Sequence, residues 1–241
     1  MTTDFKELHP RIVLAVAAHP DDIDFTAGGT VATFTRQGAE VYYLILTDGG
    51  NGSSDPAITR EHLRDTRRHE QKAACQALGA KEAFFCDYPD GFLTNSISTR
   101  RDVVRAIRHI KPDVVITFDP GTLYVAERGI VNHPDHRAAG QTTLDAIYPL
   151  ARDRRAFPEL LDEGLDPHIV KTVLLIRLDA SGNFSVDISD CMEAKLAALT
   201  AHGSQFPDIK KTHNLATTWA QEAGAANGCA YAETFTRIDI I

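Results

Sequence analysis

Short apolar segments alternate with longer segments of helical periodicity along this chain, and that alternation restricts its fold more than any other feature. The apolar segments are rich in β-branched residues, as in Ile12–Ala17 (IVLAVA) and Val41–Thr47 (VYYLILT). Such alternation is typical of βαβ units, in which helices connect parallel strands. The sequence therefore predicts an α/β fold with a mainly parallel sheet flanked by helices. Right-handed connections would bring the carboxyl ends of the strands to one edge, where such sheets bind ligands.

The same alternation gives approximate limits for each element. Several expected helices are followed by glycine or proline, which commonly end helices. The expected strands are Ile12–Ala17, Val41–Thr47, Ala83–Cys86, Asp113–Phe118, Val170–Leu178, Phe184–Val186 and Tyr231–Ile241. The expected helices are Phe25–Gln37, Arg60–Leu78, Ser98–Ile110, His136–Leu150, Asp190–Ala201 and 213–226. The charged segment 151–169 is expected to be a surface connection with a short helix.

The length and charge of the chain narrow its class. With 241 residues, a single domain spanning 1–241 is expected. The net charge of −8 argues against a broad surface for nucleic acid or anionic membranes. No segment approaches the roughly 18 apolar residues of a membrane span, and the first ten residues lack the apolar core of a signal peptide. The expected partner is therefore a small molecule.

The cysteines carry no metal or disulfide pattern. They are widely spaced, form no CxxC, and are Cys75, Cys86, Cys191 and Cys229. In a chain without a secretion signal such cysteines are expected to be reduced core residues. We therefore expect a cytoplasmic location.

The strongest chemical signal is AHPDDID, residues 18–24, directly after the first expected strand. His19 and Asp22 are three residues apart, so a tight turn or first helical turn could bring both onto one metal ion. Asp21 would then point elsewhere. Pro20 makes the turn rigid, and a His/Asp ligand set suits a catalytic zinc ion while tolerating iron.

A second cluster, NHPDHR, occupies residues 132–137 and precedes another expected helix. His133 and His136 are also three residues apart, and one of them is expected to supply the third ligand. Alone, each cluster has an ordinary explanation: helix capping for the aspartates and surface exposure for the histidines. Two such clusters at strand-to-helix junctions favour a metal site.

The order of further motifs resembles that of the PIG-L (LmbE-like) deacetylase family over nearly the whole chain. The matching segments are AHPDDID (18–24), TDG (47–49), RRHE (67–70) running to Leu78-Gly79, PDGFL (89–93), KPDVVIT (111–117), HPDHR (133–137), KLAALTAHGSQ (195–205) and YAETF (231–235). Asp24 stands where the family usually has glutamate, so contacts at this position must be made differently. The resemblance implies a Rossmann-like fold and hydrolysis of N-acetyl groups, commonly in N-acetylglucosamine conjugates.

The resemblance also implies roles for the clustered residues. His19, Asp22 and His136 would hold the metal, expected to be Zn²⁺ with Fe²⁺ or another divalent ion as the alternative. Asp21 would be the general base for the attacking water. His133 would be a charged oxyanion stabiliser or general acid, with a raised pKa and its orientation set by Asp135.

Substrate contacts are less well defined by the sequence. Arg67 or Arg68 would reach the sugar or a remote anionic group, although both could equally belong to a solvated helix face. Asp48 is expected at the rim of the site, or else as a turn former in the DGGNGSSD loop. His202 and Gln205 would close the pocket or end a helix.

Three functional hypotheses follow. The first is a zinc-dependent N-deacetylase of an N-acetylglucosamine-containing or related small molecule. The second is a metal-dependent hydratase or lyase of an unsaturated carboxylic acid on the same fold, because both reactions can use a metal-activated water. The third, a silent binding module, predicts a lost base or ligand, and none is missing. A homo-oligomer is expected from the family.

Overall fold

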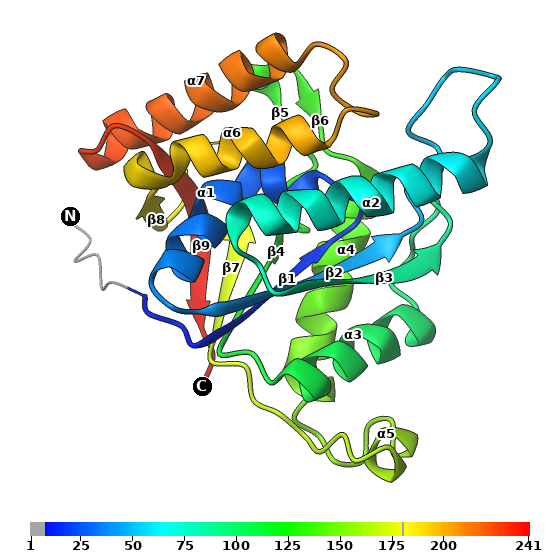
Figure 1. Ribbon diagram of the computed structural model, residues 1–241. Helices are drawn as coiled ribbons and strands as arrows, with labels where there is room; N and C mark the ends of the chain where they lie inside the picture. Colours follow the sequence, from blue (N-terminus) through cyan, green and yellow to red (C-terminus); the bar gives the residue numbers. More distant parts are fainter. Residues whose placement is uncertain (1–7, 180) are drawn as a thin grey trace.

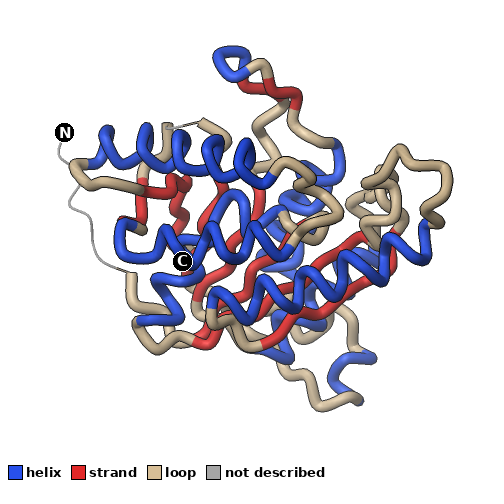
Figure 2. The backbone as a smooth tube through the Cα atoms, turned by 45° about the horizontal axis from the view of Figure 1, so that its top comes forward, coloured by secondary structure: helices blue, strands red, loops and turns tan. Residues whose placement is uncertain are grey.

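The apolar segments of the chain form the strands of one sheet with the order β3-β2-β1-β4-β7-β9-β8 (Figures 1 and 2). The computed structural model describes residues 8–179 and 181–241, so most of the N-terminal segment examined for a targeting signal lies outside the described residues. The strands are β1 (Ile12–Ala17), β2 (Glu40–Thr47), β3 (Glu82–Tyr88), β4 (Val114–Phe118), β7 (Thr172–Ile176), β8 (Phe184–Asp187) and β9 (Ala232–Asp239). The five from β3 to β7 in this order are parallel, whereas β9 runs antiparallel between β7 and β8. The predicted α/β class with a mainly parallel sheet is confirmed.

Helices cover both faces of the sheet, so successive residues of its central strands are buried on opposite sides. In β1, Val13 and Ala15 belong to one apolar cluster, while Leu14 and Val16 belong to the other. The helices are α1 (Asp22–Arg36), α2 (Arg60–Leu78), α3 (Ile97–Ile110), α4 (Pro134–Asp145), α5 (Glu159–Asp162), α6 (Met192–Ala201) and α7 (Ile209–Asn227). α1, α2 and α6 lie on one side of the sheet and α3 and α4 on the other (Figure 1).

The position of β1 determines where a ligand can bind. β1 pairs with β2 on one side and with β4 on the other, so the chain leaves the ends of β1 and β4 in different directions. Open α/β sheets bind ligands in the crevice at such a reversal of strand order. The segments that follow β1 and β4 contain the two histidine–aspartate clusters.

Two local features differ from the expected elements. A small hairpin, β5 (Tyr124–Val125) and β6 (Ile130–Val131) joined by η1 (Ala126–Arg128), follows β4. The helix expected over His136–Leu150 begins at Pro134, because proline suits the first helical position. After Asp145 the regular helix gives way to a kinked segment, η2 (Ala146–Leu150), in which Tyr148 has an extended backbone and Pro149 has no N–H for a helical hydrogen bond.

Among the described residues, no helix combines the length and apolar character needed to cross a lipid bilayer.

Candidate active site

The first cluster is held in a closed turn between β1 and α1. Asp22 is the first residue of α1, and its Oδ2 accepts a hydrogen bond from the His19 backbone N–H at 2.7 Å. The same oxygen lies 3.4 Å from His19 Nδ1. Asp22 therefore fixes the backbone of the turn and faces the His19 ring.

The second cluster approaches Asp22 from the start of α4. His136 Nε2 lies 3.0 Å from Asp22 Oδ1, and the His136 ring stacks on Phe118 with centroids 4.2 Å apart and planes inclined by 4°. Asp22 is thus placed between the two imidazoles, one on each carboxylate oxygen. This arrangement brings together the three residues expected as metal ligands.

Two separations within this trio, each to a different oxygen of Asp22, are of the size found around a tetrahedral divalent cation. Two atoms each about 2.0–2.1 Å from such an ion would be about 3.3 Å apart, close to the 3.4 Å and 3.0 Å separations around Asp22. Metal-bound histidines usually hydrogen-bond to an oxygen through the other ring nitrogen. His19 Nε2 lies 3.1 Å from Asp90 Oδ1 and 3.3 Å from Asp135 Oδ2, and His136 Nδ1 lies 3.1 Å from Asn132 Oδ1.

Other groupings of donors are also close together. One donor atom each from His19, His133 and His136 lies within 4.8 Å of the others, and the same holds for His19, Asp90 and Asp135. In the second grouping both carboxylates face His19 Nε2, the nitrogen turned away from Asp22. These carboxylates are therefore better placed to orient His19 than to bind the ion with Asp22.

The charges around His19 and Asp22 strongly favour their ionised forms. Burial alone would lower the pKa of His19, but Asp22, Asp135 and Asp90 raise it well above its usual range. Burial alone would raise the pKa of Asp22, but His136 and His19 hold it well below its usual range. The carboxylates that favour a proton on His19 would equally favour a cation bound to the neutral ring, because metal binding displaces that proton.

Asp21 is turned away from this cluster by a left-handed backbone conformation with φ of 92°. A non-glycine residue in this region is strained. Gln71 and Arg67 hold it there: Gln71 Oε1 accepts from the Asp21 N–H at 3.0 Å, and Arg67 donates to the Pro20 carbonyl at 2.7 Å and to Asp21 Oδ2 at 3.3 Å. Burial raises the pKa of Asp21 to about 6, although Arg67 opposes this shift.

Asp24, the departure from the usual family glutamate, lies behind the site and is fully buried. Its carboxylate accepts from the Tyr43 hydroxyl at 2.9 Å and from Gln71 Nε2 at 2.8 Å, and it faces His202 Nε2 at 2.8 Å. Gln71 therefore connects Asp24 to the backbone of Asp21. The shorter side chain still reaches a complete set of partners.

The three residues expected to contact substrate all form ion pairs or hydrogen bonds within the protein, at different depths. Arg67 is only 3% exposed, and its guanidinium also donates to the Gly49 carbonyl, so its polar contacts are with the protein itself. Arg68 forms an ion pair with Asp87 near the surface. Asp48 pairs with Arg60 at 2.9 Å.

The expectation for His133 and Asp135 differs from the structure. Asp135 directs its carboxylate to His19 and to the backbone N–H groups of Gly91 and Leu93, rather than to His133. It contacts His133 through its backbone N–H, which donates to His133 Nδ1 at 3.1 Å. Burial, together with the charges of His19 and His136, lowers the pKa of His133 and outweighs the opposite effect of Asp135.

Three supporting residues were not assigned from the sequence: Gln71, Asp90 and Asn132. Gln71 is one helical turn after Arg67, and this spacing on one face of a helix was a usable signal. Asn132 directly precedes the second cluster. Asp90 lies in the turn after β3, and its contact with His19 depends on tertiary structure that no local pattern predicts.

A cavity of about 350 Å³ opens in front of these groups. Its lining includes Asp21, Asp22, His133 and His136 together with mostly apolar side chains such as Phe25 and Trp219. The site therefore combines an acid–base cluster with an apolar wall.

Comparisons with known proteins identify the family of this chain. The PIG-L family, described as GlcNAc-PI de-N-acetylase, matches residues 14–147. Diacetylchitobiose deacetylase of Thermococcus kodakarensis is 35% identical over 209 residues, which cover 85% of this chain and 75% of that protein.

Solved structures extend the likeness to nearly the whole chain. N,N'-diacetylchitobiose deacetylase from Pyrococcus horikoshii has a TM-score of 0.87 at 32% identity, covering 95% of this chain and 84% of its own. GalB, a 4-carboxy-2-hydroxymuconate hydratase from Pseudomonas putida, has a TM-score of 0.77 at 21% identity, covering 96% and 97%. The second likeness shows the fold alone. The predicted family is confirmed, and this chain belongs to the PIG-L family.

Proposed function

We propose that this protein is a metal-dependent N-deacetylase that hydrolyses the acetamide of an N-acetylglucosamine-containing or related small molecule. The observation that carries the proposal is the placement of Asp22 between His19 and His136, with Asp21 beside it and turned away. Family membership and the deacetylase relatives support the same reaction.

His19 Nδ1, Asp22 and His136 Nε2 would hold the cation. When bound, a divalent cation polarises a carbonyl oxygen and lowers the pKa of water. Asp21 accepts the proton of the attacking water and returns it to the amide nitrogen as the C–N bond breaks, so that acetate and the free amine are released. With its pKa raised to about 6, it is largely ionised at neutral pH and still more basic than an exposed aspartate.

His133 is suited to stabilise the oxyanion by hydrogen bonding. Its Nδ1 accepts from the Asp135 N–H, so a neutral His133 carries its proton on Nε2. That N–H is free to donate to the oxygen of the tetrahedral intermediate. We therefore replace the charged role expected from the sequence with a neutral donor.

The remaining assignments belong to the same proposal. Zn²⁺ is the ion we favour, with Fe²⁺ as the alternative, because the ligands are imidazole and carboxylate. We place the enzyme in the cytoplasm, acting on a small molecule and assembled as a homo-oligomer. Arg67 and Asp135 position Asp21 and His19, while Arg68 and Asp48 stay as predicted contacts at the rim.

Acetate release separates the deacetylase from the hydratase alternative. Purified protein with added Zn²⁺ is offered a panel of N-acetylglucosamine conjugates, and acetate is measured together with the free amine. Equal amounts of acetate and amine are expected. No acetate from the panel, together with hydration of an unsaturated dicarboxylate, would overturn the proposal.

A further inference from the structure

An aromatic group forms one wall of the cavity in front of the catalytic cluster. Phe25, Phe206 and Trp219 all line this cavity of about 350 Å³. The Phe25 and Trp219 rings meet edge to face with centroids 5.4 Å apart, and the Phe25 and Phe206 centroids are 6.5 Å apart. These three residues, from here on the aromatic wall, are partly exposed and thus accessible to a ligand.

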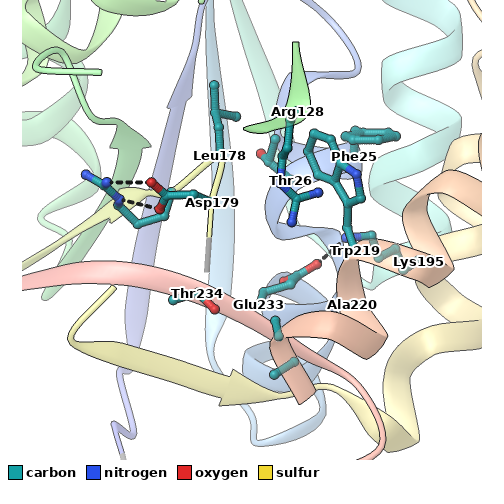
Figure 3. Close-up of a pocket in the computed structure, with 13 residues that line it drawn as sticks. Phe25, Thr26, Arg128, Leu178, Asp179, Lys195, Trp219, Ala220, Glu233 and Thr234 are labelled. Atoms are coloured by element: carbon teal, nitrogen blue, oxygen red, sulfur yellow. Dashed lines mark hydrogen bonds and ion pairs between the residues drawn. The ribbon is translucent and has the colours of Figure 1, made fainter. Parts of the chain in front are cut away.

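Trp219 is supported from behind. The Arg128 guanidinium lies 4.3 Å from the centroid of the Trp219 ring (Figure 3). Its Nη2 is 2.6 Å from Glu222 Oε2. Arg128 lines a narrow hollow of about 40 Å³ and not the cavity itself, whereas Trp219 lines both. The indole is therefore held in place by a cation on the side of the hollow.

The cations near the aromatic wall are already neutralised. Arg128 pairs with Glu222, and Lys195 Nζ lies 2.5 Å from Glu233 Oε1. Arg177 pairs with two aspartates, Asp119 and Asp179. Within the described part of the chain, no lysine or arginine lines the cavity. Among the described residues, a carboxylate or phosphate attached to the substrate would find no unpaired lysine or arginine there.

We propose that the aromatic wall is a second subsite, which binds an uncharged ring attached to the N-acetylated sugar, and that Trp219 determines this preference. The inference rests on the proposed function. Ligand sites are typically apolar and aromatic, with a few polar groups that fix orientation. The C–H face of a neutral sugar ring can pack flat against an indole, whereas an anionic group would lose its hydration without gaining a partner.

The first experiment compares kcat/KM for acetate release from N-acetylglucosamine, N,N'-diacetylchitobiose and an N-acetylglucosaminyl malate. The wild-type enzyme is expected to favour the disaccharide over both other substrates by about tenfold or more. Trp219→Ala is expected to reduce the disaccharide-to-monosaccharide ratio by about tenfold. Leu215→Ala is the matched control, because Leu215 is exposed on the same helix, and it should keep the wild-type ratio.

A second measurement does not depend on turnover. Trp219 is the only tryptophan of the chain, so its fluorescence reports directly on the aromatic wall. In the Asp21→Asn variant, N,N'-diacetylchitobiose should shift the emission in a saturable way, and N-acetylglucosamine at equal concentration should not.

The outcomes distinguish this inference from the proposed function. If both proteins release acetate, and the ratio of kcat/KM for the disaccharide to that for the monosaccharide is the same in wild type and Trp219→Ala, the second subsite is overturned. The proposed deacetylase function is then unaffected. A higher kcat/KM for the malate conjugate would overturn the claim that the second subsite prefers an uncharged ring. A saturable emission shift without acetate release from any substrate would support the aromatic wall and overturn the deacetylase. The absence of both an emission shift and acetate release would overturn the second subsite and the deacetylase together.

Discussion

Asp21 and Asp22 are neighbours in the chain, yet their surroundings shift their pKa values in opposite directions. Burial raises that of Asp21, whereas His136 and His19 overcome burial and lower that of Asp22. The left-handed backbone of Asp21 turns its carboxylate toward Arg67. A pair of carboxylates separated in this way can divide two tasks, one binding a cation and the other carrying a proton.

Asp21→Asn is therefore expected to keep the metal and lose turnover. Asparagine preserves the shape of the side chain but cannot accept the proton, so kcat should fall by about 10²–10⁴. The measurement combines acetate release with metal analysis of the purified variant.

His19→Ala is the matched variant for this prediction, because it removes a proposed ligand and should lose the ion as well as the activity. Near-wild-type turnover in Asp21→Asn would contradict the role of Asp21 as general base. Loss of the ion from Asp21→Asn would instead assign Asp21 to the ligands.

At the level of elements, the C-terminal part of the chain holds α1 in place. Glu233 of β9 accepts from the backbone N–H groups of Gly29 at 3.0 Å and Thr30 at 2.6 Å, and it pairs with Lys195 of α6. The side chains of Lys195 and Glu233 are both buried, so removal of either one would leave the other charge buried without its partner. Because α1 begins at Asp22, these contacts far from the cavity help to fix the position of the site.

Gly29→Ala is expected to destabilise the protein. A Cβ at this position would lie 2.5 Å from Ile188 Cδ1, so α1 would have to move. Overpacking of this kind typically costs about 1–3 kcal/mol in the free energy of unfolding. Urea titration of wild type and variant measures the difference.

Gly28→Ala is the control for this prediction. A Cβ at Gly28 would meet Lys195 Cγ at 3.5 Å, which is ordinary van der Waals contact. Replacing a mid-helix glycine should then leave stability unchanged or raise it by up to about 1 kcal/mol. Equal destabilisation by the two variants would show that close packing against Ile188 is not what requires glycine at position 29.

The pair of His202 and Asp24 connects α6 to α1 and should make stability depend on pH. Burial alone would lower the pKa of His202, but the hydrogen bond and charge of Asp24 raise it. A raised folded-state pKa stabilises fully below the unfolded value of about 6.5, and this contribution is lost as the pH rises through the folded value. His202→Gln should therefore destabilise the protein more at pH 6 than at pH 8. The measurement is urea unfolding of both proteins at both pH values, and an equal cost would refute the assignment.

At the scale of the whole molecule, the sequence predicts what depends on local pattern. The strand Ile12–Ala17 was predicted at its observed limits because its residues are continuously apolar, as a strand buried on both faces requires. The hairpin of β5 and β6 was not predicted, because two-residue strands have no periodicity. The antiparallel position of β9 and the contact of Asp90 with His19 depend on long-range packing.

The same contrast holds within the site. That the two clusters meet was predictable, because each directly follows or precedes a recognisable element. The choice of His136 rather than His133 came from the family resemblance. The orientation of Asp135 was not predictable, because its carboxylate is directed by the backbone of the Gly91 turn, which reaches it from another part of the sheet.

Metal binding should stabilise the whole fold, because the ligands come from segments that are far apart in the chain. His19 and Asp22 follow β1, and His136 lies in α4, so the unfolded chain does not hold them together. An ion present at about 100 times its dissociation constant would add about 2.7 kcal/mol to the free energy of unfolding. Removal of metal with a chelator should abolish acetate release and lower the melting temperature, and added Zn²⁺ should restore both.

His136→Ala separates this effect from non-specific binding of zinc. The variant loses one imidazole but keeps the rest of the site, so Zn²⁺ should no longer raise its melting temperature. Thermal unfolding of both proteins, with and without the ion, makes the comparison. The same zinc-dependent rise in wild type and variant would place the stabilising ion elsewhere.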